Sequence, residues 1–237
     1  MGFTVLRLIR REAFWRQLHL YTSLILSLQL IAWFASGLVM AIFPIDEVRG
    51  SHLKQELPMV NWQHVQYSPA QILANFPPHS QLSLSQRGSF PVYLVQHAEQ
   101  VLPIDAVTGK TLQPLTEDEV IALAKRQYRG DFKLEKILLL AEAPSEVRGI
   151  SPPIWQIVLS TPEQTTLYLD TQTGLVQRVR TDTWRLYDFF WMLHIMDYQN
   201  RENFNHGLLI FSAASALLFS LSGLVLLAQV LQRKRRH

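Results

Sequence analysis

The stretch QLHLYTSLILSLQLIAWFASGLVMAIFPI, residues 17–45, contains 29 residues and no formal charge. A second uncharged stretch of 30 residues, NFNHGLLIFSAASALLFSLSGLVLLAQVLQ, occupies residues 203–232. Each is longer than the ~20 apolar residues that an α-helix needs to cross the hydrocarbon core of a bilayer. The two stretches exclude a single soluble domain and predict transmembrane helices over residues 17–43 and 203–231.

Charge separates the two ends of the chain from its middle. Four arginines precede the first stretch and four basic residues follow the second, whereas the 157 residues from Asp46 to Glu202 carry 14 basic and 18 acidic residues, a net charge of −4. The positive-inside rule therefore predicts cytoplasmic ends, residues 1–16 and 232–237, and a middle segment, residues 44–183, on the outer side of the membrane. The first stretch is too long for a cleaved signal peptide. The pI of about 9.3 favours anionic lipid headgroups as partners over nucleic acid.

The composition also excludes several kinds of site. The chain has no cysteine, so disulfides, iron–sulfur clusters, thiolate metal sites and covalently attached c-type haem are excluded. None of the ten glycines stands two residues from another, so neither a G-x-G-x-x-G motif nor a P-loop is present. Metal chemistry must depend on histidine, methionine, carboxylates or the backbone.

The middle segment contains a repeated pattern. The sequence D-x-x-T-G occurs at Asp105–Gly109 and at Asp170–Gly174, each time after strand-like runs that follow a short helix signal. Thr116 and Glu119 have the spacing of a capping box at the second helix signal. We therefore predict two α+β repeats, about residues 60–114 and 115–183. Residues 143–153 should add a loop to the second copy.

An aromatic and apolar segment, residues 184–202, joins the second repeat to the second hydrophobic stretch and predicts a juxtamembrane amphipathic helix. This segment, with Leu193–Tyr198 at its centre, and the D-x-x-T-G repeats together resemble the PepSY domain and its associated transmembrane helices. The resemblance is greatest to short two-span ferric reductases of bacterial inner membranes and extends to four-span ferric-siderophore reductases. It implies an α+β membrane protein in which two transmembrane helices flank a duplicated PepSY-like domain. It also implies haem b held by histidines, with electrons delivered outward to ferric iron.

Three histidines lie in or beside the hydrophobic stretches. His19 is inside the first, where an unpaired polar group is costly; it is either a haem ligand or an interfacial histidine bonded to a neighbour. His194 projects either into a haem pocket lined by aromatic residues or toward lipid headgroups. His206, at the outer end of the second stretch, is the rival ligand. The remaining five lie in polar segments or in the basic tail and are expected at the surface: His52, His64, His79, His97 and His237.

Depth in the membrane constrains how these residues combine. The helical rise places His19 about 30 Å from Met40 along the first helix, so His19 cannot share a haem with His194 or His206. A homodimer would bring equivalent histidines together in a four-helix bundle, with one or two haems b per dimer. Small residues in the second helix favour close helix packing: Ser212, Ala216 and Ser220. Met40, Met192 and Met196 are alternative axial ligands to the haem iron.

These features predict a haem b ferric reductase acting on ferric iron or a ferric chelate. Asp188, Asp197 and Glu202 are candidate docking groups for Fe³⁺, because hard cations prefer oxygen ligands, or else they are solvated charges at a membrane edge. Without a flavin or nicotinamide motif, the electron donor must be a quinol or a cytosolic reductase. The alternative is a PepSY binding or regulatory module that binds or inhibits a partner protein through a sheet edge. A transporter subunit is disfavoured by the two spans and by their lack of a carboxylate.

Overall fold

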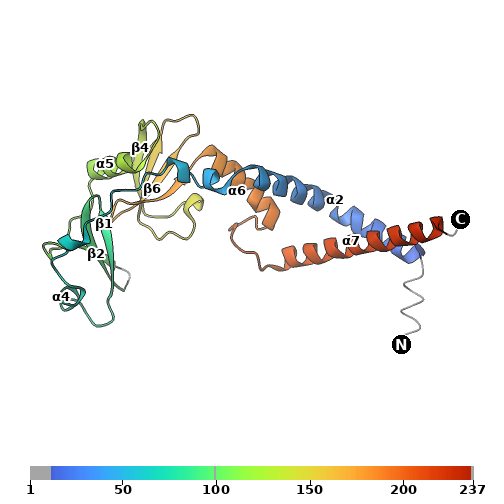
Figure 1. The fold of residues 1–237 in the computed structure, drawn as a ribbon, viewed down its shortest axis with the longest axis horizontal. Coiled ribbons are helices and arrows are strands. Elements are labelled where there is room, and N and C mark those ends of the chain that lie inside the picture. Colours follow the sequence, from blue (N-terminus) through green and yellow to red (C-terminus); the bar gives the residue numbers. More distant parts are fainter. Residues whose placement is uncertain (1–11, 99, 236–237) are drawn as a thin grey trace. The chain divides into compact units, whose positions relative to one another are not determined.

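The computed structural model describes residues 12–98 and 100–235, and over these residues the fold is mixed α+β with two antiparallel sheets (Figure 1). The chain divides into two compact units. The sheet unit is Pro44–Leu186, and the helical unit combines the chain before Pro44 with Tyr187–His237. Arg7, Arg10, Arg11, Arg236 and His237 lie outside the described residues, so the orientation inferred from the basic ends stays a prediction.

Two long helices make up most of the helical unit. They are α2 (Glu12–Ile42) and α7 (Gly207–Lys234), and both are long and apolar enough to cross a membrane, as predicted. They lie side by side near the C-terminal end of the chain (Figure 1). Many of their large apolar side chains remain uncovered, including Leu28, 81% exposed, and Phe34, 73% exposed. Such surfaces suit lipid tails or further helices.

The helix ends follow local chemistry. α2 ends at Ile42, two residues before Pro44, which cannot continue a helix. α7 begins at Gly207 and not at residue 203, because His206 is its N-cap and its side chain accepts the N–H of Leu209 at 3.3 Å. Asn203 forms a local turn instead, in which its Oδ1 accepts the N–H of Asn205 at 2.8 Å.

The first half of the sheet unit contains a helix and a three-stranded sheet. Helix α4 (Pro69–Leu73) begins with a capping box between Ser68 and Gln71. Three antiparallel strands follow in the order β1-β2-β3: β1 (Gln81–Arg87), β2 (Phe90–His97) and β3 (Gln100–Asp105). Their core is Ile72, Tyr93, Val95, Ile104 and Ala106.

The second half repeats this order with one more strand. Helix α5 (Glu117–Gln127) begins with the predicted capping box of Thr116 and Glu119. The four-stranded antiparallel sheet has the order β4-β5-β6-β7. Its strands are β4 (Leu134–Leu140), β5 (Ile154–Leu159), β6 (Thr166–Asp170) and β7 (Val176–Arg180). The expected extra loop lies between β4 and β5. Short helices complete the unit: α3 (Ile45–Val48), η1 (Ser51–Leu53), η2 (Trp62–His64) and η3 (Ser145–Val147).

Both D-x-x-T-G sequences form the same turn after the third strand of their half. The carboxylates of Asp105 and Asp170 accept two backbone N–H groups each, and the glycine four residues on has φ +68° in both turns. A Cβ at Gly109 would lie 2.8 Å from the ring of Tyr67, and one at Gly174 would lie 2.4 Å from Leu123. Glycine is therefore required in each turn both by its φ and by close contact, with Tyr67 just before α4 in the first half and with Leu123 of α5 in the second.

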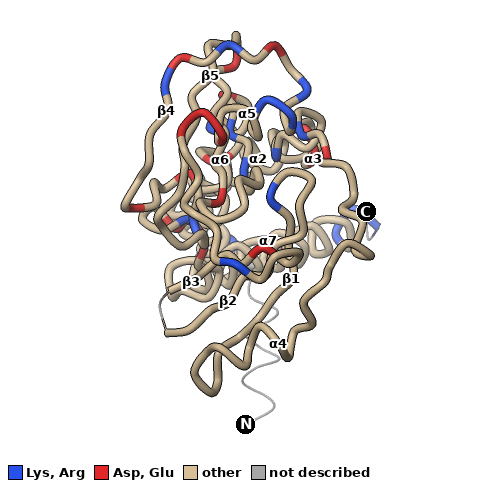
Figure 2. Tube along the Cα trace, turned by 90° about the vertical axis from the view of Figure 1, so that its left-hand side faces the viewer, with Lys and Arg blue, Asp and Glu red and all other residues tan. Residues whose placement is uncertain are grey.

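Helix α6 (Asp182–Ile195) begins in the sheet unit and ends in the helical unit. Arg185 fixes its first turn, with Nε donating to Glu146 at 2.7 Å and Nη1 donating to Asp182 at 3.0 Å. The helix ends at Ile195 and does not reach residue 202, because Met196 takes φ +57° and a loop begins there. Figure 2 shows charged residues along the sheet unit and basic residues beside the C-terminal end of α7.

Candidate functional site

Asp197 organises the loop between α6 and α7. Its Oδ1 accepts the backbone N–H groups of Gln199 and Asn200 at 3.3 and 3.1 Å, and its Oδ2 accepts those of Glu202 and Asn203 at 3.1 and 3.0 Å. These hydrogen bonds, with that from Asn203 contributing most, lower the pKa of Asp197 to about 2. The ionised carboxylate thereby holds the loop in one conformation.

Arg201 joins this loop to α6. Its guanidinium donates to the buried carboxylate of Asp188, and its carbonyl accepts the indole N–H of Trp191 at 3.0 Å. The ring of Trp191 in turn meets that of Phe204 edge-on, with centroids 5.4 Å apart. The loop and the last turns of α6 therefore form a fixed wall with an aromatic face.

His194 lies in the last turn of α6 and is held by α2. Its Nδ1 is 2.9 Å from Oγ of Ser36, and its carbonyl accepts the indole N–H of Trp33 at 2.8 Å. Ser36 is fully buried. Nε2 of His194 has no hydrogen-bond partner among the described residues. The ring is therefore fixed through one nitrogen while the other stays available.

A mainly apolar pocket of about 730 Å³ opens beside His194 within the helical unit. Its volume is within the range of about 300–1,000 Å³ that is usual for small-molecule sites. His194 is the one ionisable side chain among the residues that line it. The lining is Trp33, Phe34, Gly37, Met40, Trp191, His194, Ile195, Phe204 and Leu209.

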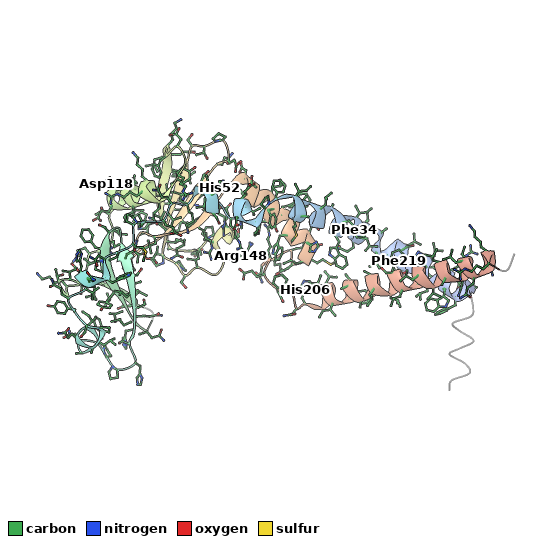
Figure 3. All side chains as sticks on the ribbon, viewed as in Figure 1. Phe34, His52, Asp118, Arg148, His206 and Phe219 are labelled. Atoms are coloured by element: carbon green, nitrogen blue, oxygen red, sulfur yellow. The ribbon has the colours of Figure 1, made fainter. Side chains whose placement is uncertain are left out.

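His206 differs from His194 because both of its ring nitrogens are engaged. Nδ1 accepts the N–H of Leu209 as the cap of α7, which leaves Nε2 protonated to donate to the carbonyl of Ile195 at 2.9 Å. Figure 3 shows His206 at the start of α7. Ligation of a metal by His206 would break one of these two bonds. The geometry therefore favours His194 over its rival.

His19 is held between α2 and α7. Its Nδ1 is 2.9 Å from Oγ of Ser222 and 3.3 Å from the carbonyl of Phe219, and its ring stacks on the ring of Phe219 with centroids 4.4 Å apart. Phe219 lies in the part of α7 that runs beside α2 (Figure 3). A second pocket of about 470 Å³ adjoins the ring and is lined by Arg16, Gln17, His19, Leu20, Ser23 and Leu226.

The sequence analysis missed the two serines that hold these rings. Ser36 and Ser222 are both fully buried, and each is the first residue of the tetrapeptide Ser-Gly-Leu-Val, which occurs once in each long helix, at residues 36–39 and 222–225. The repeated tetrapeptide was the available signal. The predicted small-residue stripe is less uniform, because Ser212 is buried while Ser220 is exposed.

The two histidine sites are well separated. His19 lies 18 positions before Gly37, the residue of α2 that faces the ring of His194. At the helical rise this is about 27 Å, so one chain does not bring His19 and His194 to a common metal. Among the candidate methionines, Met40 lines the pocket of His194. Met192 and Met196 are not among its lining residues.

The three candidate docking carboxylates have no common site. Asp188 pairs with Arg201, Asp197 binds backbone N–H groups, and Glu202 follows in the same loop. Over residues 12–98 and 100–235, no three His, Asp or Glu side chains gather closely enough to hold a metal ion. Their role in docking ferric iron stays a prediction.

The residues around His194 fit a haem. A porphyrin is flat and largely apolar, so it requires aromatic and aliphatic walls and an imidazole with an available Nε2. The pocket supplies both. Comparison of the chain with known protein families, with characterised proteins and with solved structures gives no match, so the PepSY resemblance stays an expectation from sequence.

Proposed function

We propose that this chain is a haem b ferric reductase of the bacterial inner membrane, which reduces ferric iron or a ferric chelate on the periplasmic side. The observation that carries the proposal is the mainly apolar pocket of about 730 Å³ that is lined by His194, whose ring is held through Nδ1. The two long apolar helices support placement in a membrane. The duplicated α+β unit would correspond to PepSY domains.

The residues around the pocket have separate tasks. His194 would hold the haem iron, while Trp33 fixes the backbone of His194 through the 2.8 Å hydrogen bond to its carbonyl. Trp191 and Phe204 line one wall of the pocket and would exclude water from it. When bound, haem b supplies a one-electron couple at its iron. The protein sets its orientation, ligation and access.

A second residue to hold the haem would come either from a second copy of the chain or from Met40. A two-fold homodimer would place two His194 side chains at the same depth, and the uncovered apolar faces of α2 and α7 would pack in a four-helix bundle. Met40 lines the same pocket and would act within one chain. A methionine ligand would raise the reduction potential relative to two imidazoles.

The electron donor would be a quinol or a cytosolic reductase. In the second case His19 would hold an inner haem. Electrons would then cross the membrane from the end where Arg16 and the C-terminal basic residues lie.

The purified protein tests the proposal directly. A Soret band that shifts when dithionite reduces the protein, and shifts back when a ferric chelate reoxidises it, supports the proposal. A colourless protein from haem-sufficient cells contradicts it. His97 is an exposed histidine of the sheet unit. His97→Ala is therefore the matched control and should leave the Soret band and ferric reduction unchanged.

A binding module without redox chemistry is the second candidate. It is favoured by β1, an edge strand of the three-stranded sheet, and by a groove of about 460 Å³ that includes Leu84, Gln86 and Trp62. An extended peptide could add to such an edge by backbone hydrogen bonds. Absence of haem together with specific capture of a partner protein would favour this function.

A further inference from the structure

The two serines that contact His19 and His194 make the same bond within their own helices. Ser36 Oγ donates to the carbonyl of Trp33 at 3.1 Å, and Ser222 Oγ donates to the carbonyl of Phe219 at 2.7 Å. Both are bonds to the residue three positions earlier, a common arrangement for serine in a helix. A hydroxyl has one proton, so neither Oγ retains a proton for a second partner.

This arrangement makes the histidine the donor in each contact. With the serine proton directed at its own helix, Oγ accepts from Nδ1–H of the ring at 2.9 Å in both sites. The contact of His19 with the carbonyl of Phe219, at 3.3 Å, gives the same answer, because a carbonyl oxygen only accepts. Both neutral rings then carry their proton on Nδ1, and Nε2 has a free lone pair.

We propose that Ser36 and Ser222 are positioning residues that hold His194 and His19 in the Nδ1–H tautomer, so that each Nε2 is set to ligate a metal. This inference rests on the proposed function for the identity of the metal, but its geometry stands without it. Free histidine in water favours the opposite tautomer, in which Nε2 carries the proton. Metal-bound histidines use a hydrogen bond from the other nitrogen in this way, and the partner of that bond fixes the ring orientation.

The neighbouring glycines complete each arrangement. A Cβ at Gly37 would lie 3.7 Å from Cε1 of His194, and one at Gly223 would lie 3.1 Å from Cε1 of His19. Cε1 lies between the two ring nitrogens, so the glycine leaves space for the ring edge while the serine before it accepts the hydrogen bond from Nδ1–H. In each helix, therefore, the serine and the glycine that follows it both lie beside the Nδ1–Cε1 edge of the imidazole ring.

The test is the tautomeric state of the two histidines in the full-length protein. The chain is labelled with ¹⁵N-histidine, purified from haem-depleted cells, and its ring nitrogens are observed by NMR. His194→Ala and His19→Ala identify the two signals. We expect Nδ1 protonated and Nε2 unprotonated in both rings of the wild type. Ser36→Ala should lower the ratio of Nδ1–H to Nε2–H at His194 by about fivefold, the size of one neutral hydrogen bond. Ser36→Thr should restore it.

Ser27→Ala is the matched control. Ser27 makes the same bond to the residue three positions earlier, at 3.2 Å to the carbonyl of Leu24, but among the described residues no hydrogen bond joins its side chain to a histidine. Removal of the Ser27 hydroxyl should leave the tautomers of His194 and His19 unchanged. Ser222→Ala supplies an independent trial at His19, which keeps the proposal testable if Ser36→Ala fails to fold.

Two results would overturn the proposal: a wild-type His194 or His19 with its proton on Nε2, or a folded Ser36→Ala protein whose tautomer is unchanged. Failure of the proposed function is distinguishable from either. A chain that never binds haem but has both rings in the Nδ1–H form contradicts the reductase and leaves the positioning role intact. A chain that binds haem but carries the proton on Nε2 in its haem-free form contradicts the positioning role and leaves the reductase intact.

Discussion

His194 and His19 are held in the same way but lie in different surroundings. Each ring contacts a buried serine and a glycine of a neighbouring helix. His194 opens onto the larger pocket, whose lining is almost wholly apolar, whereas His19 stacks on Phe219 and adjoins a smaller pocket with Arg16 and Gln17 in its wall. The same serine–histidine contact thus holds one ring beside an apolar pocket and the other ring between the packed helices α2 and α7.

The largest expected effect separates the two histidines by function. His194→Ala should lower ferric reduction by at least about 100-fold with any donor, because the proposed haem ligand is lost. His19→Ala should stop reduction driven by a cytosolic donor and spare reduction driven by dithionite from the outer side. Rates measured in proteoliposomes with each donor check both statements. Equal loss in the two variants with both donors would remove the distinction.

Glycine substitutions should sharpen the comparison in stability. Gly223→Ala should destabilise the helical unit by about 1–3 kcal/mol, because the new Cβ overpacks against the ring of His19. Gly37→Ala should be neutral or stabilise by up to about 1 kcal/mol, because its Cβ makes an ordinary contact and alanine is the better helix former. Thermal unfolding in detergent measures the difference. Gly207→Ala, whose Cβ would meet no atom within 4 Å, is the control, and equal effects at Gly37 and Gly223 would contradict this assignment.

The capping role of His206 predicts a smaller change. His206→Ala should cost about 1 kcal/mol of stability, since the N-cap of α7 is lost, while His206→Ser should retain most of it. Haem content should be unchanged in both variants, as measured by absorbance per chain. A loss of haem in the serine variant would make His206 the ligand.

The smallest effect concerns pH. The pKa of Asp197 is lowered to about 2 in the folded chain, below the ordinary value near 4. The contribution of Asp197 to the stability of the fold is therefore fully present above about pH 4 and is lost as the pH falls toward about 2. Asp197→Asn should release the loop at neutral pH, seen as faster backbone hydrogen exchange in residues 197–203. Glu117→Gln in the sheet unit is the control, and unchanged exchange in Asp197→Asn would contradict the role.

Local sequence signals predicted more of the fold than of the site. The two long helices, the capping box of Thr116 and Glu119, and the D-x-x-T-G turns each depend on residues close together in the chain, so their patterns could be recognised. The contact between Ser36 and His194 joins residues 158 positions apart, so the repeated Ser-Gly-Leu-Val tetrapeptide marks the serine without showing which side chain it contacts. The end of α6 at Ile195 also escaped prediction, because it depends on the loop that Asp197 organises.

The most direct measurement of the central claim is the amount of haem per chain in the wild type, His194→Ala and His19→Ala, each purified from haem-sufficient cells and checked for helix content. The account predicts a haem in the wild type whose periplasmic site is lost with His194→Ala and kept with His19→Ala. If His19→Ala also lowers the content, it does so by removing a second, inner haem. A folded His194→Ala protein that keeps its full haem content and its ferric reduction would contradict the account.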